Sequence, residues 1–157
     1  MSKQDFTVTF SVDQTPEEVF AAINDVRSWW TGEIDGRTDV LGARFTYSHK
    51  DIHRTTHEIT ELVPGQRVVW HVTASTLSFV ANKQEWDGTD IVFDIMKKHD
   101  KTEVRFTHVG LAPAIECYDR CSRAWSFFIA DSLKKRVLAS PSEPSTKSPP
   151  AERRAVR

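Results

Sequence analysis

The sequence lacks several features that would assign it to a specialised class. No apolar run approaches the roughly 20 residues that span a bilayer, and the first residues lack the apolar region of a secretion signal. Lys and Arg number 21 against 22 Asp and Glu, a net charge of −1, so no global field attracts nucleic acid or anionic lipid. We therefore expect a cytoplasmic protein with no nucleic-acid partner and no membrane insertion.

Cysteine is also scarce, since only Cys117 and Cys121 occur. They lie four residues apart in a helical pattern, where a disulfide would strain the helix. Two free thiols in a reducing compartment are therefore expected.

The chain does contain enough apolar and aromatic residues for one folded domain. Of its 157 residues, 39% are apolar, and five Trp and nine Phe are among them. A chain of this size can bury a core without disulfides or structural metal. Residues 140–157 differ, because they contain four Pro and four Ser and almost no large apolar side chain. We expect a domain over 1–139 and a disordered tail over 140–157.

The N-terminal part predicts a strand followed by two short helices. Residues 5–12 alternate between apolar and polar side chains, which is typical of a half-buried strand. Thr15-Pro16-Glu17-Glu18 then combines a capping hydroxyl, Pro at the first helical position and a capping Glu. A helix to about Asn24 is expected, with a second short turn over 26–30.

Five further segments show the alternation of a strand: 44–48, 53–62, 67–73, 91–96 and 103–108. Val63-Pro64-Gly65-Gln66 places Pro and Gly at the centre of a turn, so the second and third of these segments form a hairpin. That register pairs Ile59 with Trp70.

The C-terminal part of the folded region changes to helical periodicity. Apolar residues recur at three- and four-residue steps over 115–138, which predicts one long amphipathic helix. The element order indicates an α+β fold, in which a curved antiparallel sheet of about six strands wraps around this helix. A curved sheet that does not close on one helix leaves a space in which a ligand can bind.

Metal and catalytic motifs give little support to other functions. His53 and His57 are about 13 Å apart on a strand, too far for one ion. His108, Cys117 and Cys121 give only three ligands without the paired spacing of zinc ribbons. Neither a G-x-S-x-G elbow nor a phosphate-binding glycine loop occurs. We expect no metal and no cofactor, and we assign no catalytic residue.

The aromatic residues are the more informative feature. Trp and Tyr add a polar group to an apolar wall, so their number favours an aromatic-lined cavity between sheet and helix. The polar segment 75–89 is predicted to form its rim or lid. The predicted ligand-binding residues are Trp30, Phe45, Tyr47, His57, Trp70, Phe93, Phe106, His108, Trp125 and Phe128.

The sequence resembles the SRPBCC or START-like superfamily and, within it, the family of homologues of the activator of the heat-shock-protein-90 ATPase. The resemblance covers residues 5–138. It is carried by Pro16-Glu17-Glu18-Val19-Phe20, Trp29-Trp30, Glu61-Leu62-Val63-Pro64-Gly65, Val68-Val69-Trp70, Glu85-Trp86-Asp87-Gly88-Thr89, Phe106-Thr107-His108-Val109-Gly110-Leu111, Trp125 and Ser132-Leu133-Lys134.

The resemblance implies a helix-grip fold, a curved antiparallel sheet around a C-terminal helix with a hydrophobic cavity. Relatives in the superfamily bind lipids, hormones or polyketides, and a few catalyse cyclisation or hydrolysis. Our leading hypothesis is a non-enzymatic domain, monomeric or homodimeric, that binds a small apolar or aromatic molecule. Two alternatives remain open: a chaperone-associated or stress-response interaction module, and an enzyme of the cyclase or hydrolase type. The enzyme requires His57 or His108 beside a carboxylate at the pocket.

Overall fold

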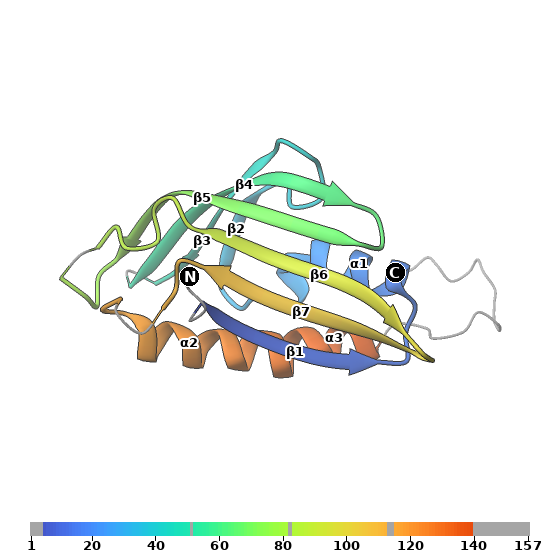
Figure 1. The fold of residues 1–157 in the computed structure, drawn as a ribbon. Coiled ribbons are helices and arrows are strands. Elements are labelled where there is room, and N and C mark those ends of the chain that lie inside the picture. Colours follow the sequence, from blue (N-terminus) through green and yellow to red (C-terminus); the bar gives the residue numbers. More distant parts are fainter. Residues whose placement is uncertain (1–4, 51, 82, 113–114, 140–157) are drawn as a thin grey trace.

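The computed structural model describes residues 5–50, 52–81, 83–112 and 115–139, and in these residues seven strands form one antiparallel sheet (Figure 1). The strands are β1 (Phe6–Val12), β2 (Glu33–Gly36), β3 (Arg44–His49), β4 (His53–Val63), β5 (Arg67–Leu77), β6 (Asp90–Lys98) and β7 (Lys101–Val109). Their order in the sheet is β1-β7-β6-β5-β4-β3-β2. The predicted tail over 140–157 lies outside the described residues.

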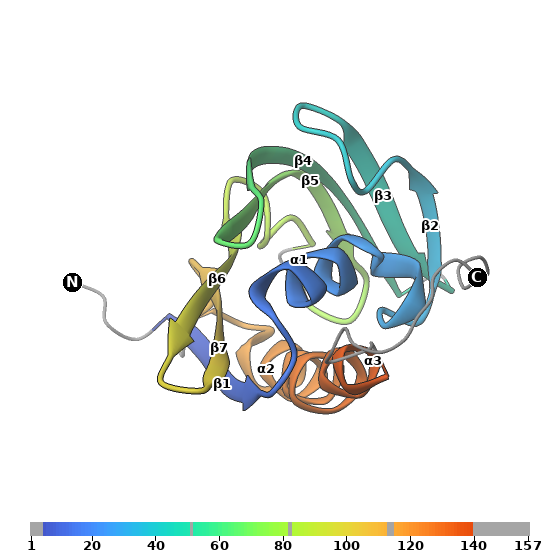
Figure 2. The same ribbon diagram turned by 90° about the vertical axis from the view of Figure 1, so that its right-hand side faces the viewer.

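The helices lie on the inner, concave side of the sheet (Figure 2). They are α1 (Pro16–Asn24), the 3-10 turn η1 (Val26–Ser28), α2 (Tyr118–Phe127), the π-helical segment η2 (Phe128–Leu133) and α3 (Lys134–Leu138). The last three form the predicted long helix, and the π-helical segment in its middle was not predicted. The α+β helix-grip fold is confirmed. Among the described residues, no helix combines the length and apolarity needed to cross a membrane.

The capping residues predicted for α1 act as expected. The Glu18 backbone N–H donates to the Thr15 hydroxyl at 3.1 Å, and the Thr15 N–H donates to the Glu18 carboxylate at 2.9 Å. Two backbone donors that a helix start leaves unpaired are thereby satisfied. The helix begins at Pro16, whose missing N–H costs nothing at this position.

The β4–β5 hairpin has the predicted turn and two register shifts beyond it. The Gln66 N–H donates to the Val63 carbonyl at 2.9 Å, and Gly65 takes the positive φ of 71° that this turn requires. Val63 pairs with Arg67, whereas Ile59 pairs with Trp70 as predicted. A bulge between these two pairs absorbs the difference of one residue.

Two strand predictions need correction. Strand β2 was missed, because its four residues contain a single large apolar side chain and give no alternating pattern. Strand β5 extends to Leu77, so the loop predicted over 75–89 begins only after that residue. Ser75 and Leu77 are buried and pair with the start of β4, and this long-range pairing is not visible in a local pattern.

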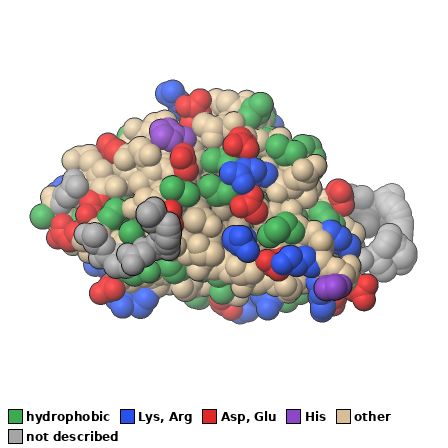
Figure 3. Space-filling view, viewed as in Figure 1, with side chains coloured by type: hydrophobic (Ala, Val, Ile, Leu, Met, Phe, Trp, Pro, Cys, Tyr) green, Lys and Arg blue, Asp and Glu red, His purple; other side chains and the backbone are tan. Residues whose placement is uncertain are grey.

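The core fills the space between the concave face of the sheet and the helices. Its largest fully buried side chains are Trp70, Trp125, Phe45, Phe93, Phe106, Ile23, Ile59, Leu77, Ile91, Leu111, Ile129 and Leu133. The opposite, convex face carries acidic and basic side chains side by side (Figure 3). There Arg67 forms ion pairs with Glu61 and Asp94 on the flanking strands. Apolar and aromatic side chains are therefore concentrated on the concave side, and charged ones on the convex side.

Candidate functional site

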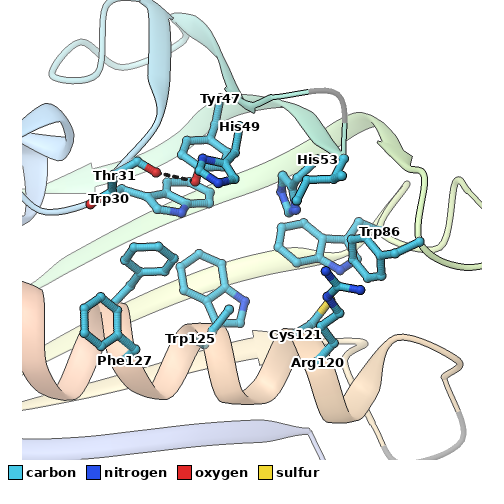
Figure 4. A pocket seen from close by; sticks show the side chains of 14 residues that line it. Trp30, Thr31, Tyr47, His49, His53, Trp86, Arg120, Cys121, Trp125 and Phe127 are labelled. Atoms are coloured by element: carbon cyan, nitrogen blue, oxygen red, sulfur yellow. Dashed lines mark hydrogen bonds between the residues drawn. The ribbon is translucent and has the colours of Figure 1, made fainter.

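A cavity of about 360 Å³ lies between the β3–β4 end of the sheet and α2 (Figure 4). Three parts of the chain form its walls: residues after η1 together with the β3–β4 hairpin, the loop over 78–89, and the C-terminal helix. In that order the lining residues are Trp30, Thr31, Tyr47, His49, Ile52 and His53; Phe79 and Trp86; and Arg120, Cys121, Ala124, Trp125, Phe127 and Phe128. Half of these side chains are aromatic rings of Trp, Tyr or Phe.

Four of the ten predicted residues line this cavity: Trp30, Tyr47, Trp125 and Phe128. The rings of Trp30 and Tyr47 stack with centroids 3.9 Å apart, and Trp125 lies 4.9 Å from Trp30. The Tyr47 hydroxyl donates to the Thr31 carbonyl at 2.5 Å. Burial raises the pKa of Tyr47 to about 12, so this hydroxyl stays protonated and fixed.

The structure places the other six predicted residues in the packed core. They are Phe45, His57, Trp70, Phe93, Phe106 and His108, each at most 1% exposed. Trp70 packs edge-on against Phe45 and Phe93, with both ring centroids 5.0 Å away. Alternation along a strand shows which side chains face the helix, but it does not show at which end of the strand the helix leaves space.

Ten lining residues were not among the predicted ones: Thr31, His49, Ile52, His53, Phe79, Trp86, Arg120, Cys121, Ala124 and Phe127. Two features of the sequence could have identified some of these residues. His53 shares a strand face with His57, since the two differ by an even number of residues. Phe79 and Trp86 are the aromatic residues of the segment predicted as rim or lid.

A chain of hydrogen bonds holds Trp125 in place behind the cavity wall. The Trp125 indole N–H donates to His108 Nδ1 at 3.0 Å, so His108 carries its proton on Nε2. That Nε2–H donates to the Thr89 hydroxyl at 2.9 Å, and the hydroxyl donates to the Trp86 carbonyl at 2.7 Å. Burial lowers the pKa of His108 to about 3, with a smaller contribution because a proton on His53 would repel one on His108. The neutral imidazole therefore links two walls of the cavity.

Comparison with known families assigns this architecture. The family described as "Activator of Hsp90 ATPase homolog 1-like protein" (AHSA1) matches residues 13–137. The chain belongs to the AHSA1-like family. No curated protein matches the sequence.

Solved structures share the fold of this AHSA1-like domain. The Aha1 dimer of Colwellia psychrerythraea superposes with a TM-score of 0.68 at 21% identity, covering 87% of this chain and 98% of that one. Protein MLL2253 of Mesorhizobium loti gives 0.65 at 17% identity, covering 86% and 98%. DynU16, from the dynemicin biosynthetic locus, gives 0.65 at 14% identity, covering 88% of this chain and 48% of its own. At these identities the similarity establishes the fold alone.

Two other histidines, His53 and His57, connect the core of the AHSA1-like domain to the cavity. The Thr55 hydroxyl lies 2.8 Å from His57 Nε2 and 3.4 Å from His53 Nε2. Burial lowers the pKa of His53 to about 4, with a smaller contribution from His49. Burial likewise lowers the pKa of His57 far below its usual 6.5, with smaller contributions because a proton on His53 or His108 would repel one on His57. His53 thus presents a neutral imidazole to the cavity at neutral pH.

The two cysteines are free thiols beside the cavity, and Cys121 forms part of its wall. The Cys121 thiol donates to the Cys117 sulfur, which lies 2.7 Å away. This bond lowers the pKa of Cys117 and raises that of Cys121, so the shared proton resides on Cys121.

Two carboxylates fasten the loop over 78–89 to the start of the C-terminal helix. Glu85 accepts the backbone N–H groups of Glu116 and Cys117 at 2.8 and 3.0 Å. In return, the Glu116 carboxylate accepts the Ala81 N–H at 3.1 Å. The loop that carries Phe79 and Trp86 is therefore attached to the helix that carries the opposite wall.

The histidines of the AHSA1-like domain bear on the metal and enzyme alternatives. Within the described part of the chain, no group of three or more His, Cys, Asp or Glu side chains is arranged so that it could hold a metal ion. The cyclase or hydrolase alternative needs a carboxylate beside His57 or His108. The hydrogen-bond partners of these rings among the described residues are Thr55 for His57, and Trp125 and Thr89 for His108.

Proposed function

We propose that this AHSA1-like domain binds a small apolar or aromatic molecule in the cavity between the sheet and α2. The observation that carries the proposal is the cavity itself, about 360 Å³ in volume and walled by aromatic rings. This volume falls within the range of small-molecule sites, which are mostly apolar and contain few polar groups. The proposal is narrower than the sequence-based one, since it uses the lining residues and leaves the six core residues out.

Access to the cavity supports the same proposal. Phe127 is 54% exposed and Ile52 is 36% exposed, although both line the cavity. Exposed apolar side chains at the mouth of an apolar cavity are typical of sites that capture ligands from water. The π-helical segment η2 begins directly after Phe127, and such segments occur frequently at functional sites.

The polar groups of the lining can orient a ligand without adding negative charge. The neutral imidazole of His53 can donate or accept one hydrogen bond. The Tyr47 hydroxyl already donates to Thr31, but its oxygen can still accept. Apolar burial then supplies the affinity, and these groups select the orientation.

A fluorescence titration with N-phenylnaphthylamine, a neutral aromatic probe, tests the proposal. We expect saturable binding at one site, weakened at least about tenfold by Ala124→Phe, because the added ring occupies the cavity. The matched control is Ala130→Phe, since Ala130 is exposed on the same helix but does not line the cavity. Absence of binding to the wild-type protein, or equal weakening by both variants, would overturn the proposal.

The family description and the Colwellia Aha1 structure favour a second candidate, an interaction with an Hsp90-type chaperone. Such an interaction would use the surface and would be independent of the cavity. We expect purified protein to stimulate the ATPase of an Hsp90 equally with and without Ala124→Phe. If the wild-type protein gives no stimulation at saturating concentration, this candidate is rejected.

A further inference from the structure

The charge distribution of the cavity is one-sided. Of the lining residues that the structure describes, Arg120 alone carries a permanent charge, and no Asp or Glu is among these residues. The neighbouring imidazole of His53 is neutral at physiological pH, because burial lowers its pKa to about 4. The described part of the cavity wall therefore combines aromatic rings with a single fixed positive charge.

Arg120 is positioned to use that charge on a ligand. Its guanidinium carbon lies 4.5 Å above the ring centroid of Phe79. Figure 4 shows the side chain rising from α2 toward Trp86, into the space between helix and loop. Stacking on an aromatic face leaves the N–H groups at the edge of the guanidinium available as donors.

Two acidic side chains of this region, Glu85 and Glu116, are engaged elsewhere. Among the described residues, no carboxylate forms an ion pair with Arg120. Glu85 and Glu116 bind the backbone N–H groups that join the loop to the helix, and neither lines the cavity. The guanidinium thus has no counter-ion among the described residues at the edge of this apolar cavity, where a ligand can supply one.

We propose that the ligand is an amphipathic organic anion, whose apolar or aromatic body fills the cavity and whose anionic group pairs with Arg120. This inference rests on the proposed function and makes it more specific. A planar guanidinium binds a carboxylate or sulfonate through two parallel hydrogen bonds. A cationic ligand of the same shape is disfavoured by the same residue.

The expected gain in affinity is moderate because Arg120 is exposed to solvent. Water and salt screen a pair at the mouth of a cavity, and a charge-assisted hydrogen bond contributes more than a neutral one. We expect an anionic group to improve binding about five- to tenfold at low salt, and the gain to shrink as salt rises.

Two fluorescent probes separate this inference from the proposed function. Anilinonaphthalene sulfonate has the aromatic framework of N-phenylnaphthylamine with an added sulfonate. We expect the wild-type protein to bind the sulfonate about five- to tenfold more tightly than the neutral probe. Arg120→Gln should remove this preference, so that the sulfonate and the neutral probe bind the variant with affinities within about twofold of each other.

The controls use the same helix. Arg123→Gln removes an exposed Arg that does not line the cavity, and it should leave both affinities unchanged. Near-ultraviolet circular dichroism verifies that each variant keeps its packing, which excludes probe binding to a loosened core. If the neutral probe binds but the wild-type protein shows no preference for the sulfonate, the inference is wrong and the proposed function stands. If neither probe binds, both are rejected.

Discussion

Acid should destabilise this domain, because it holds three histidines in neutral form: the buried His57 and His108 and the partly buried His53. Burial lowers the pKa of His53 to about 4 and that of His108 to about 3, and it lowers the pKa of His57 far below the usual 6.5. In the unfolded chain each imidazole titrates near 6.5. Below that pH the unfolded state binds more protons than the folded state, so stability is complete above pH 6.5 and falls as the pH falls.

The size of this effect follows from linkage. Each histidine that stays neutral in the folded state contributes about 1.4 kcal/mol of lost stability per pH unit once the unfolded imidazole is charged. At pH 5 one such group costs about 2 kcal/mol and three cost about 6 kcal/mol. Since small domains have a total stability of about 5–15 kcal/mol, the protein should be marginal at this pH.

Urea unfolding at a series of pH values from 7.5 to about 5 measures the loss. His108→Gln should reduce the difference in free energy of unfolding between neutral pH and pH 5 by about one third. His99→Asn is the matched control, because His99 is exposed in the β6–β7 turn. A change below about 1 kcal/mol over this range would refute the reasoning, since it would mean that these imidazoles accept protons in the folded state.

Three further substitutions test the framework around the cavity. Gly32→Ala should lower the free energy of unfolding by about 2 kcal/mol or more. Gly32 has a φ of +153°, and a Cβ there would lie 2.5 Å from a Tyr47 ring carbon. Urea unfolding measures the loss, and an unchanged midpoint would contradict this prediction. Thr89→Val should cost about 1–3 kcal/mol through its two lost hydrogen bonds, whereas Thr76→Val on the exposed side of β5 should cost less than about 0.5 kcal/mol. Glu85→Gln should accelerate hydrogen exchange at the amides of Glu116 and Cys117, and exchange rates equal to wild type would show that this carboxylate does not fasten the loop.

Local sequence patterns determined most of the architecture. Each predicted strand has a counterpart in the sheet, because alternation directly reflects which side chains face the core. The caps of α1 by Thr15 and Glu18 and the β4–β5 turn at Gly65 could also be predicted. These roles depend only on neighbours a few residues away. The features that were missed depend on distant pairing: strand β2, the end of β5 and the bulge in β4.

The site was less accessible from sequence than the fold. Trp30, Tyr47, Trp125 and Phe128 line the cavity, but Trp70 has the same pattern and lies in the core. Whether an inward side chain meets space or another side chain depends on how the helix crosses the curved sheet. Arg120 was not predicted because an Arg on the polar side of a helix gives no local signal of a cavity beside it.

The five Trp indole N–H signals in an NMR titration with N-phenylnaphthylamine test the central claim most directly. Trp30, Trp86 and Trp125 line the cavity, whereas Trp29 and Trp70 do not. A ligand held between sheet and helix should shift the first three signals and leave the last two nearly unchanged. Equal shifts of all five signals, or no shift at saturating probe, would contradict a binding site in this cavity.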